Sequence, residues 1–148
     1  MSKYKKLSHV IYQCKYHLVF VTKYRYKVLE GIIKKQLEED IRMYSEWKSV
    51  EIEEMNIQKD HVHIVVSIPP KVSVSEYMGV IKGKTAIKMF KSYPQLKKKP
   101  YWGNHFWAPG YFVSTVGLDE EMIRRYVKYQ EEEEEQKEEE NSTDFRLF

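Results

Sequence analysis

Two histidines separated by one residue are the part of this chain best suited to chemistry. His61 and His63 lie in the run 61–68, whose β-branched and apolar residues predict a strand. Alternate residues of a strand project from the same face, so both imidazoles point the same way, about 7 Å apart at their backbones. Val62 and the apolar residues that alternate with it predict a core on the other face. The pair therefore suits holding one metal ion against a phosphate.

A tyrosine and a glutamine near the end of the chain form a second pair. Tyr126 and Gln130 are spaced i, i+4 in a stretch that predicts a helix, so they are neighbours on one helical face. The glutamine lies inside an otherwise apolar arc, which needs an explanation. Without the histidines, a helix that packs its apolar arc on a sheet, with a tyrosine at its edge, is the better explanation of the pattern.

Hydrophobic periodicity predicts the elements that must position these residues. Strands are expected at 11–22, 50–57, 61–68 and 111–116, and helices at 28–47, 73–91 and 120–136, with residues 1–10 as a basic arm. Ser73 is the expected cap of the second helix. The order β-α-β-β-α-β plus a helix predicts an α+β, ferredoxin-like (RRM-like) fold, an antiparallel sheet with helices on one face. We expect a single domain over 1–136 and a flexible acidic tail over 137–148.

The charge of the chain is divided unevenly between its body and one short segment. Residues 131–140 hold eight Glu and one Lys, whereas residues 1–130 hold 23 Lys or Arg and 13 Asp or Glu, a net charge of +10. A basic body predicts a polyanionic partner. Twelve Tyr, six Phe and three Trp add the stacking surfaces that single-stranded nucleic acid binding uses.

The remaining composition predicts a cytoplasmic protein. No run of about 18 apolar residues predicts a membrane span, and the N-terminus lacks the apolar stretch of a signal peptide. The single cysteine, Cys14, cannot form an internal disulfide, which fits a reducing compartment.

Taken together, these features resemble the single-tyrosine HUH transposases of the insertion-sequence 200/605 family. The resemblance rests on the His61-Val62-His63 strand, the Tyr126 and Gln130 pair, and the segments 17–25 (HLVFVTKYR) and 109–117 (PGYFVSTVG). It runs over nearly all of residues 9–130. A histidine triplet alone occurs by chance in many strands, but its place in this element order, with a tyrosine helix downstream, is specific.

The resemblance implies a role for each residue of the two pairs. His61 and His63 bind a divalent metal, and Gln130 completes the protein ligands. Tyr126 attacks the scissile phosphate of single-stranded DNA and leaves a 5′-phosphotyrosine and a free 3′-hydroxyl. Tyr129 points about 100° away from Gln130 on a helix, so Tyr126 is favoured as the nucleophile.

The resemblance also implies a metal, a form of DNA and an assembly. The metal is Mg²⁺ or Mn²⁺, although two imidazoles and an amide suit transition metals better than Mg²⁺. The DNA carries hairpins at the element ends. The working unit is a homodimer with joined sheets, in which the tyrosine helix of one subunit completes the histidine site of the other.

Basic residues and one further histidine are candidates for binding DNA. A solvated charged face explains the lysines almost as well, and an ordinary histidine on a sheet surface explains His17 at least as well. The candidates are Lys23, Arg25, Lys82, Lys84, Lys88, Lys97, Lys98, Lys99 and His17.

Two alternatives to an active transposase stay open at this point. A non-catalytic RRM-like module that binds RNA or DNA would use the aromatic residues of the sheet for stacking. That alternative leaves the paired histidines and the tyrosine helix unexplained. A domesticated relative that processes repeat hairpins would keep the same chemistry without moving an element.

Overall fold

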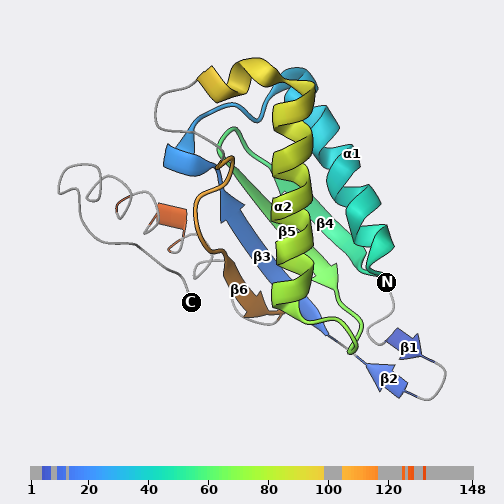
Figure 1. The fold of residues 1–148 in the computed structure, drawn as a ribbon. Helices are drawn as coiled ribbons and strands as arrows, with labels where there is room; N and C mark the ends of the chain where they lie inside the picture. Colours follow the sequence, from blue (N-terminus) through green and yellow to red (C-terminus); the bar gives the residue numbers. More distant parts are fainter. Residues whose placement is uncertain are drawn as a thin grey trace.

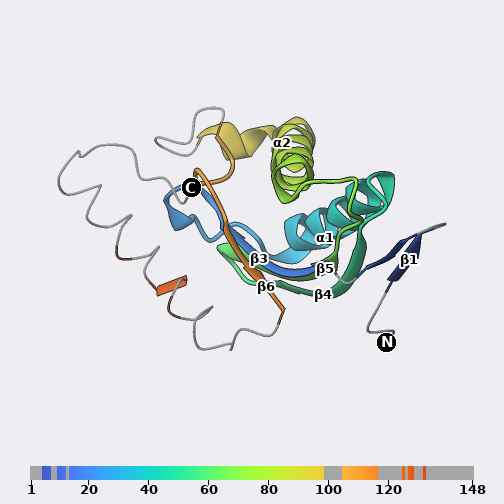
Figure 2. The same cartoon turned by 90° about the horizontal axis from the view of Figure 1, so that it is seen from below.

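The computed structural model describes residues 5–7, 10–12, 14–98, 105–116 and the single positions 125, 127, 128 and 132. A four-stranded antiparallel sheet with strand order β4-β5-β3-β6 forms its centre. The strands are β3 (Lys15–Val21), β4 (Glu51–Ile57), β5 (His61–Ser67) and β6 (Phe112–Thr115). Helices α1 (Gly31–Trp47) and α2 (Val74–Ser92) lie side by side on one face of this sheet (Figures 1 and 2). The predicted antiparallel sheet with two helices on one face is confirmed.

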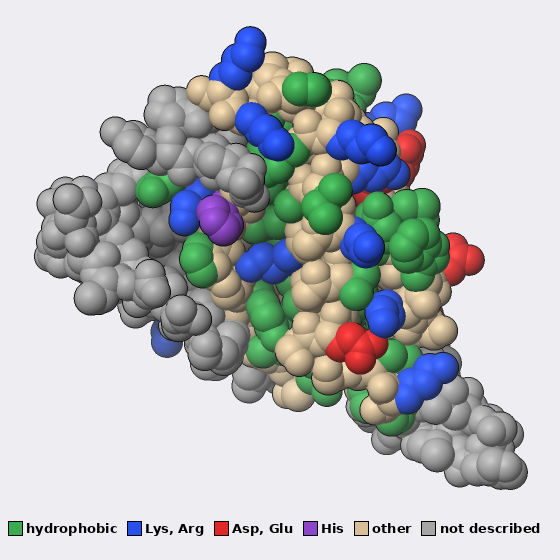
Figure 3. Space-filling model, in the orientation of Figure 1, with side chains coloured by type: hydrophobic (Ala, Val, Ile, Leu, Met, Phe, Trp, Pro, Cys, Tyr) green, Lys and Arg blue, Asp and Glu red, His purple; other side chains and the backbone are tan. Residues whose placement is uncertain are grey.

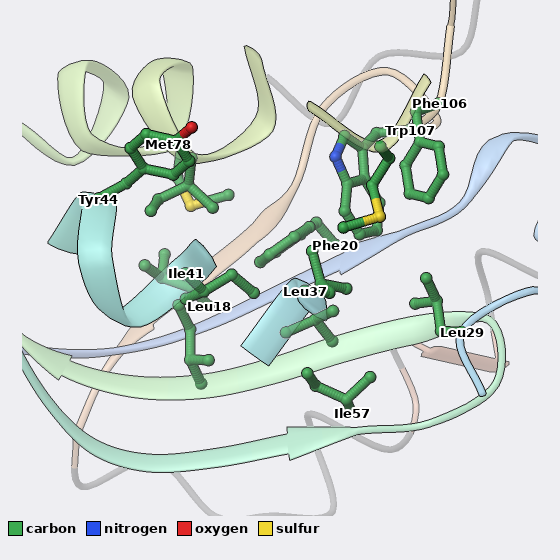
Figure 4. Packing of buried hydrophobic residues seen from close by; sticks show 14 of the residues in the cluster. Leu18, Phe20, Leu29, Leu37, Ile41, Tyr44, Ile57, Met78, Phe106 and Trp107 are labelled. Atoms are coloured by element: carbon green, nitrogen blue, oxygen red, sulfur yellow. The ribbon is translucent and has the colours of Figure 1, made fainter. Parts of the chain in front are cut away.

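The core lies between the sheet and the two helices. Leu18 and Phe20 of β3 alternate with residues of the opposite face, and both are buried against the helices (Figure 4). Val62, Ile64 and Val66 of β5 do the same, as their alternation with the histidines predicts. The helices contribute mainly leucine, isoleucine and methionine; these residues are Leu37, Ile41, Met78, Ile81 and Met89.

Helix α2 begins where its sequence predicts. The Ser73 Oγ atom accepts a hydrogen bond from the Glu76 amide at 3.0 Å, which satisfies one of the free N–H groups of the first turn. The expected start of the first helix at residue 28 is wrong, because Val28 and Leu29 are buried in irregular chain before α1, which begins at Gly31. The Leu29 amide donates instead to the carbonyl of Lys59 at 2.9 Å.

The expected continuous strand over 11–22 is also wrong. Residues 10–12 form β2 (Val10–Tyr12), which pairs with β1 (Lys5–Leu7) as a separate antiparallel hairpin, where only a basic arm was expected. Strand β3 begins at Lys15, opposite the last residue of β5. The partner strand ends there and two prolines follow, which cannot donate to a ladder. The chain before Lys15 therefore has little of the central sheet to pair with.

The aromatic connection between α2 and β6 is part of the core. A 3-10 helix, η2 (Pro94–Lys98), follows α2. Phe106 and Trp107 are both buried, and each ring packs edge-on, with the Trp107 ring 4.8 Å from that of Phe20 (Figure 4). The indole N–H of Trp107 donates to Thr85 of α2 at 3.0 Å. These contacts fix the segment that leads into β6.

Most of the expected last helix and the acidic tail lie outside the described residues, and so do Tyr126 and Gln130. The described positions 125, 127, 128 and 132 are helical. Among the residues that the structure describes, no helix is long and apolar enough to cross a membrane.

Candidate metal and nucleic-acid site

The two histidines of β5 lie on the face of the sheet that α1 and α2 leave uncovered. His61 pairs in register with Val21 of β3, and His63 pairs with Val19. Both histidines are partly exposed, while Val62 between them is fully buried on the core side. Strand geometry thus places two imidazoles on one face, where a ligand can reach them.

His61 is held from behind by a carboxylate. Its Nδ1 atom lies 2.8 Å from Asp60 Oδ1, and Arg25 contacts the other oxygen of the same carboxylate through Nη2 at 2.8 Å and Nε at 3.1 Å. Burial alone would raise the pKa of Asp60. The hydrogen bond from His61 and the charge of Arg25 outweigh burial, so the pKa of Asp60 lies below its ordinary value of 3.8. Asp60 is therefore a carboxylate at neutral pH.

His63 has a histidine neighbour on the next strand. The Nδ1 atom of His17 lies 3.1 Å from Nε2 of His63, and the ring centroids are 5.4 Å apart. His17 pairs in register with Val65, so it is the diagonal neighbour of His63 on the same face. His17 therefore belongs to this site rather than to an unrelated part of the sheet surface.

The geometry of the two histidines suits a metal ion, but the described residues do not complete a ligand set. A carboxylate behind a histidine fixes the tautomer and the orientation of the ring, and His61 and Asp60 have this arrangement. No group of three His, Cys, Asp or Glu residues within the described part of the chain could hold an ion alone. A metal ion bound here would need further ligands of another residue type or from residues outside the described set, where Gln130 lies.

Besides His17, three of the nine DNA-binding candidates form hydrogen bonds or ion pairs within the protein. Lys82 donates to the carbonyls of Ala108 and Gly110 at 2.9 and 2.6 Å, and burial lowers its pKa from 10.5 to about 8. Lys88 pairs with buried Asp40 at 2.7 Å, which raises the pKa of Lys88. Arg25 pairs with Asp60 as described above. These contacts give the three side chains structural roles.

The other candidates differ in exposure. Lys84, Lys97 and Lys98 are exposed, and Lys23 is partly exposed with its ammonium group 5.2 Å from the centre of the Tyr24 ring. Separated Lys and Arg side chains spread over the helical face of the molecule (Figure 3). Lys99 lies outside the described residues.

Asp60 is the one site residue that the sequence patterns did not single out. It lies in the short polar segment between the strands expected at 50–57 and 61–68. A carboxylate next to a candidate metal-binding histidine is the signal that would have found it.

Comparison with known proteins identifies the family of this chain. The sequence profile described as "Transposase IS200 like" matches residues 10–130. The chain belongs to the IS200-like transposase family. It is 40% identical over 130 residues to the transposase for insertion sequence element IS200 of Salmonella typhimurium, covering 88% of this chain and 85% of that protein. It is 35% identical over 127 residues to the ISDra2 transposase TnpA of Deinococcus radiodurans, covering 85% of this chain and 90% of the relative.

Solved structures agree with the family assignment. A crystal structure from Deinococcus radiodurans R1, assigned provisionally as a transposase, superposes with a TM-score of 0.78 at 30% identity. The superposition covers 85% of this chain and 97% of that one. A REP-associated tyrosine transposase bound to a REP hairpin shares the fold, with a TM-score of 0.54 at 16% identity over 87% of this chain and 70% of that chain. The IS200-like chain is thus a transposase by family and by fold.

Proposed function

We propose that this IS200-like transposase cleaves and rejoins single-stranded DNA at the ends of an insertion sequence. The observation that carries the proposal is the pair His61 and His63, which share the face of β5 that α1 and α2 do not cover (Figure 2), with Asp60 behind the first ring. A non-catalytic RRM-like module would leave this arrangement unexplained. We also infer a ferredoxin-like architecture, because the strand order β4-β5-β3-β6 is that of two interleaved β-α-β units.

Tyr126 is the proposed nucleophile. Its hydroxyl oxygen forms a bond to the scissile phosphorus, and the bond from phosphorus to the 3′ oxygen breaks. The tyrosine proton passes to solvent, and the leaving 3′ oxygen takes one up, which yields a 5′-phosphotyrosine and a free 3′-hydroxyl. A 3′-hydroxyl that attacks the same phosphorus in reverse rejoins the strand without another energy source.

The protein's part in this reaction is to bind and orient. A tyrosine hydroxyl has a pKa near 10, so at neutral pH it needs exact placement against the phosphate. His61, His63 and Gln130 are the proposed ligands of Mg²⁺ or Mn²⁺. When bound, such an ion withdraws charge from the phosphate oxygens. Manganese suits the two imidazoles better than magnesium does.

The proposed partners are DNA and a second copy of the chain. We propose that the substrate carries hairpins near the element ends. The exposed lysines Lys84, Lys97 and Lys98, with Lys99 beside them in sequence and Lys23 at the end of β3, are the remaining candidates for phosphate contacts. We further propose a homodimer with joined sheets, whose active sites are completed by the tyrosine helix of the partner.

A covalent adduct is the direct test of this function. The protein is incubated with single-stranded DNA from its own locus and Mn²⁺ or Mg²⁺, and adducts are separated on a denaturing gel. We expect an adduct that disappears in Tyr126→Phe and persists in the matched control Tyr129→Phe. Absence of any adduct with both metals and both strands, together with retained binding, would favour the non-catalytic module.

A further inference from the structure

Arg25 and Asp60 form a chain of contacts that ends on the ring of His61. We propose that these two are positioning residues, which hold His61 with its Nδ1 atom protonated and its Nε2 atom directed to a metal ion. The metal part of this inference rests on the proposed function. The orientation of the ring does not, because it follows from contacts within the protein.

The two oxygens of Asp60 have separate partners. Oδ1 lies 2.8 Å from the His61 Nδ1 atom, while Oδ2 receives both guanidinium contacts of Arg25. A carboxylate can only accept hydrogen bonds, so Nδ1 of His61 must carry the hydrogen. A neutral imidazole then has its lone pair on Nε2, which becomes the atom available to a metal.

The contact between Arg25 and Asp60 is shielded from solvent. The side chains of Arg25 and Asp60 are only 15% and 12% exposed. An arginine in this position is poorly placed to serve as a free phosphate clamp. Its planar group instead fixes the orientation of the carboxylate, because two N–H groups converge on one oxygen.

Tyr24 and Arg25 adopt a backbone conformation that is rare for residues other than glycine. Tyr24 and Arg25 have φ values of +54° and +52°, both in the left-handed region. Each such residue is strained, and the surrounding structure must offset that strain. Consecutive strained residues at this point indicate that the turn is held in place by its surroundings.

Thr22 ties this turn to the residue that positions His61. Its amide donates to the Asp60 carbonyl at 3.0 Å, and its fully buried hydroxyl donates to the carbonyl of Tyr26 at 2.8 Å. The Lys23 amide donates in turn to the carbonyl of Phe106 at 3.0 Å. The end of β3, the turn before β5 and the segment before β6 are therefore joined at one point, next to His61 (Figure 1).

The protonation pattern of His61 tests this inference in the metal-free protein. Long-range ¹H–¹⁵N spectra of protein labelled at histidine nitrogens distinguish a hydrogen on Nδ1 from one on Nε2, with His61→Gln used for assignment. We expect Nδ1–H in the wild type. Asp60→Ala and Arg25→Ala should shift His61 toward Nε2–H, the form that free histidine favours in water, and Arg25→Lys should shift it less than Arg25→Ala.

Metal affinity provides the second readout, by Mn²⁺ titration followed with electron paramagnetic resonance. Loss of a partner behind a metal-binding histidine weakens metal binding by about 10–100-fold, and we expect this for Asp60→Ala. The control is Arg42→Ala, an exposed arginine whose pairing with Glu38 spans 3.6 Å on the surface of α1. Circular dichroism and a urea titration establish that each variant is folded.

The outcomes separate this inference from the proposed function. Nε2–H on His61 in the wild type would overturn the positioning role, and so would Mn²⁺ binding in Asp60→Ala as tight as in the wild type. Either result leaves a wild-type DNA adduct, and thus the proposed function, intact. Nδ1–H in the wild type that is lost in Asp60→Ala supports the positioning role even if no adduct forms.

Discussion

Replacement of the half-buried Lys82 by methionine gives a prediction whose size follows from the structure. Lys82 joins α2 to the segment before β6 through two backbone carbonyls, and burial lowers its pKa to about 8. In the unfolded chain the pKa returns to the ordinary value of 10.5. Between about pH 8 and pH 10.5, Lys82 of the unfolded chain holds a proton that Lys82 of the folded protein has released. Folding stability must therefore rise with pH across this window, and the full penalty for the buried charge is present below pH 8.

The expected change is large enough to measure. With these two pKa values, the Lys82 contribution to the free energy of unfolding rises by about 2 kcal/mol between about pH 7 and about pH 9.5. Methionine fills similar space but cannot titrate. The difference in stability between wild type and Lys82→Met should thus grow by about that amount in favour of the wild type. Other lysines and tyrosines titrate in both proteins and cancel.

Urea unfolding at both pH values, followed by circular dichroism, measures this difference. Lys84→Met is the matched control, because Lys84 lies two residues further along α2 and is exposed. We expect its difference from the wild type to stay constant with pH. A Lys82→Met difference that is equally independent of pH would refute the lowered pKa of this half-buried lysine.

Three further predictions concern stability and activity. Tyr77→Phe should lower the free energy of unfolding by about 1–3 kcal/mol in urea titrations, because it leaves buried Ser45 without the hydroxyl that lies 2.6 Å away. Ser73→Ala should cost about 1 kcal/mol by the same assay, since it removes the cap of α2, and Ser73→Asp should restore most of it. His63→Ala should abolish the DNA adduct, while binding of the same oligonucleotide in a gel-shift assay persists. Loss of oligonucleotide binding in this variant would contradict the role of His63 as a metal ligand.

Regular periodicity made much of the fold predictable. The alternation of β5 places two histidines on one face and an apolar stripe on the other, and that pattern depends only on strand geometry. The start of α2 was equally predictable, because Ser73 can act as a cap without any distant partner. The apolar residues Val28 and Leu29 fit a helical period by sequence, yet they are buried in the core from irregular chain before α1. Periodicity alone cannot distinguish these two uses.

The partners of charged side chains were not predictable from local sequence. Lys82 binds carbonyls 26 and 28 residues further along the chain, and Arg25 binds a carboxylate 35 residues away. A lysine or arginine in a basic sequence looks the same whether it faces DNA or the interior. The sequence therefore identified the types of residue in the site. The structure then shows which basic side chains bind groups within the protein, such as Lys82 and Arg25, and which are exposed, such as Lys84.

Identification of the residue that becomes linked to DNA tests the central claim most directly. Adducts formed with a short single-stranded oligonucleotide are digested with nuclease and protease, and the modified peptide is sequenced by tandem mass spectrometry. We expect a nucleotide 5′-phosphate on Tyr126, formed only when a divalent metal is present. A phosphate on Tyr129, or an adduct of equal yield in His61→Ala and without metal, would contradict the account.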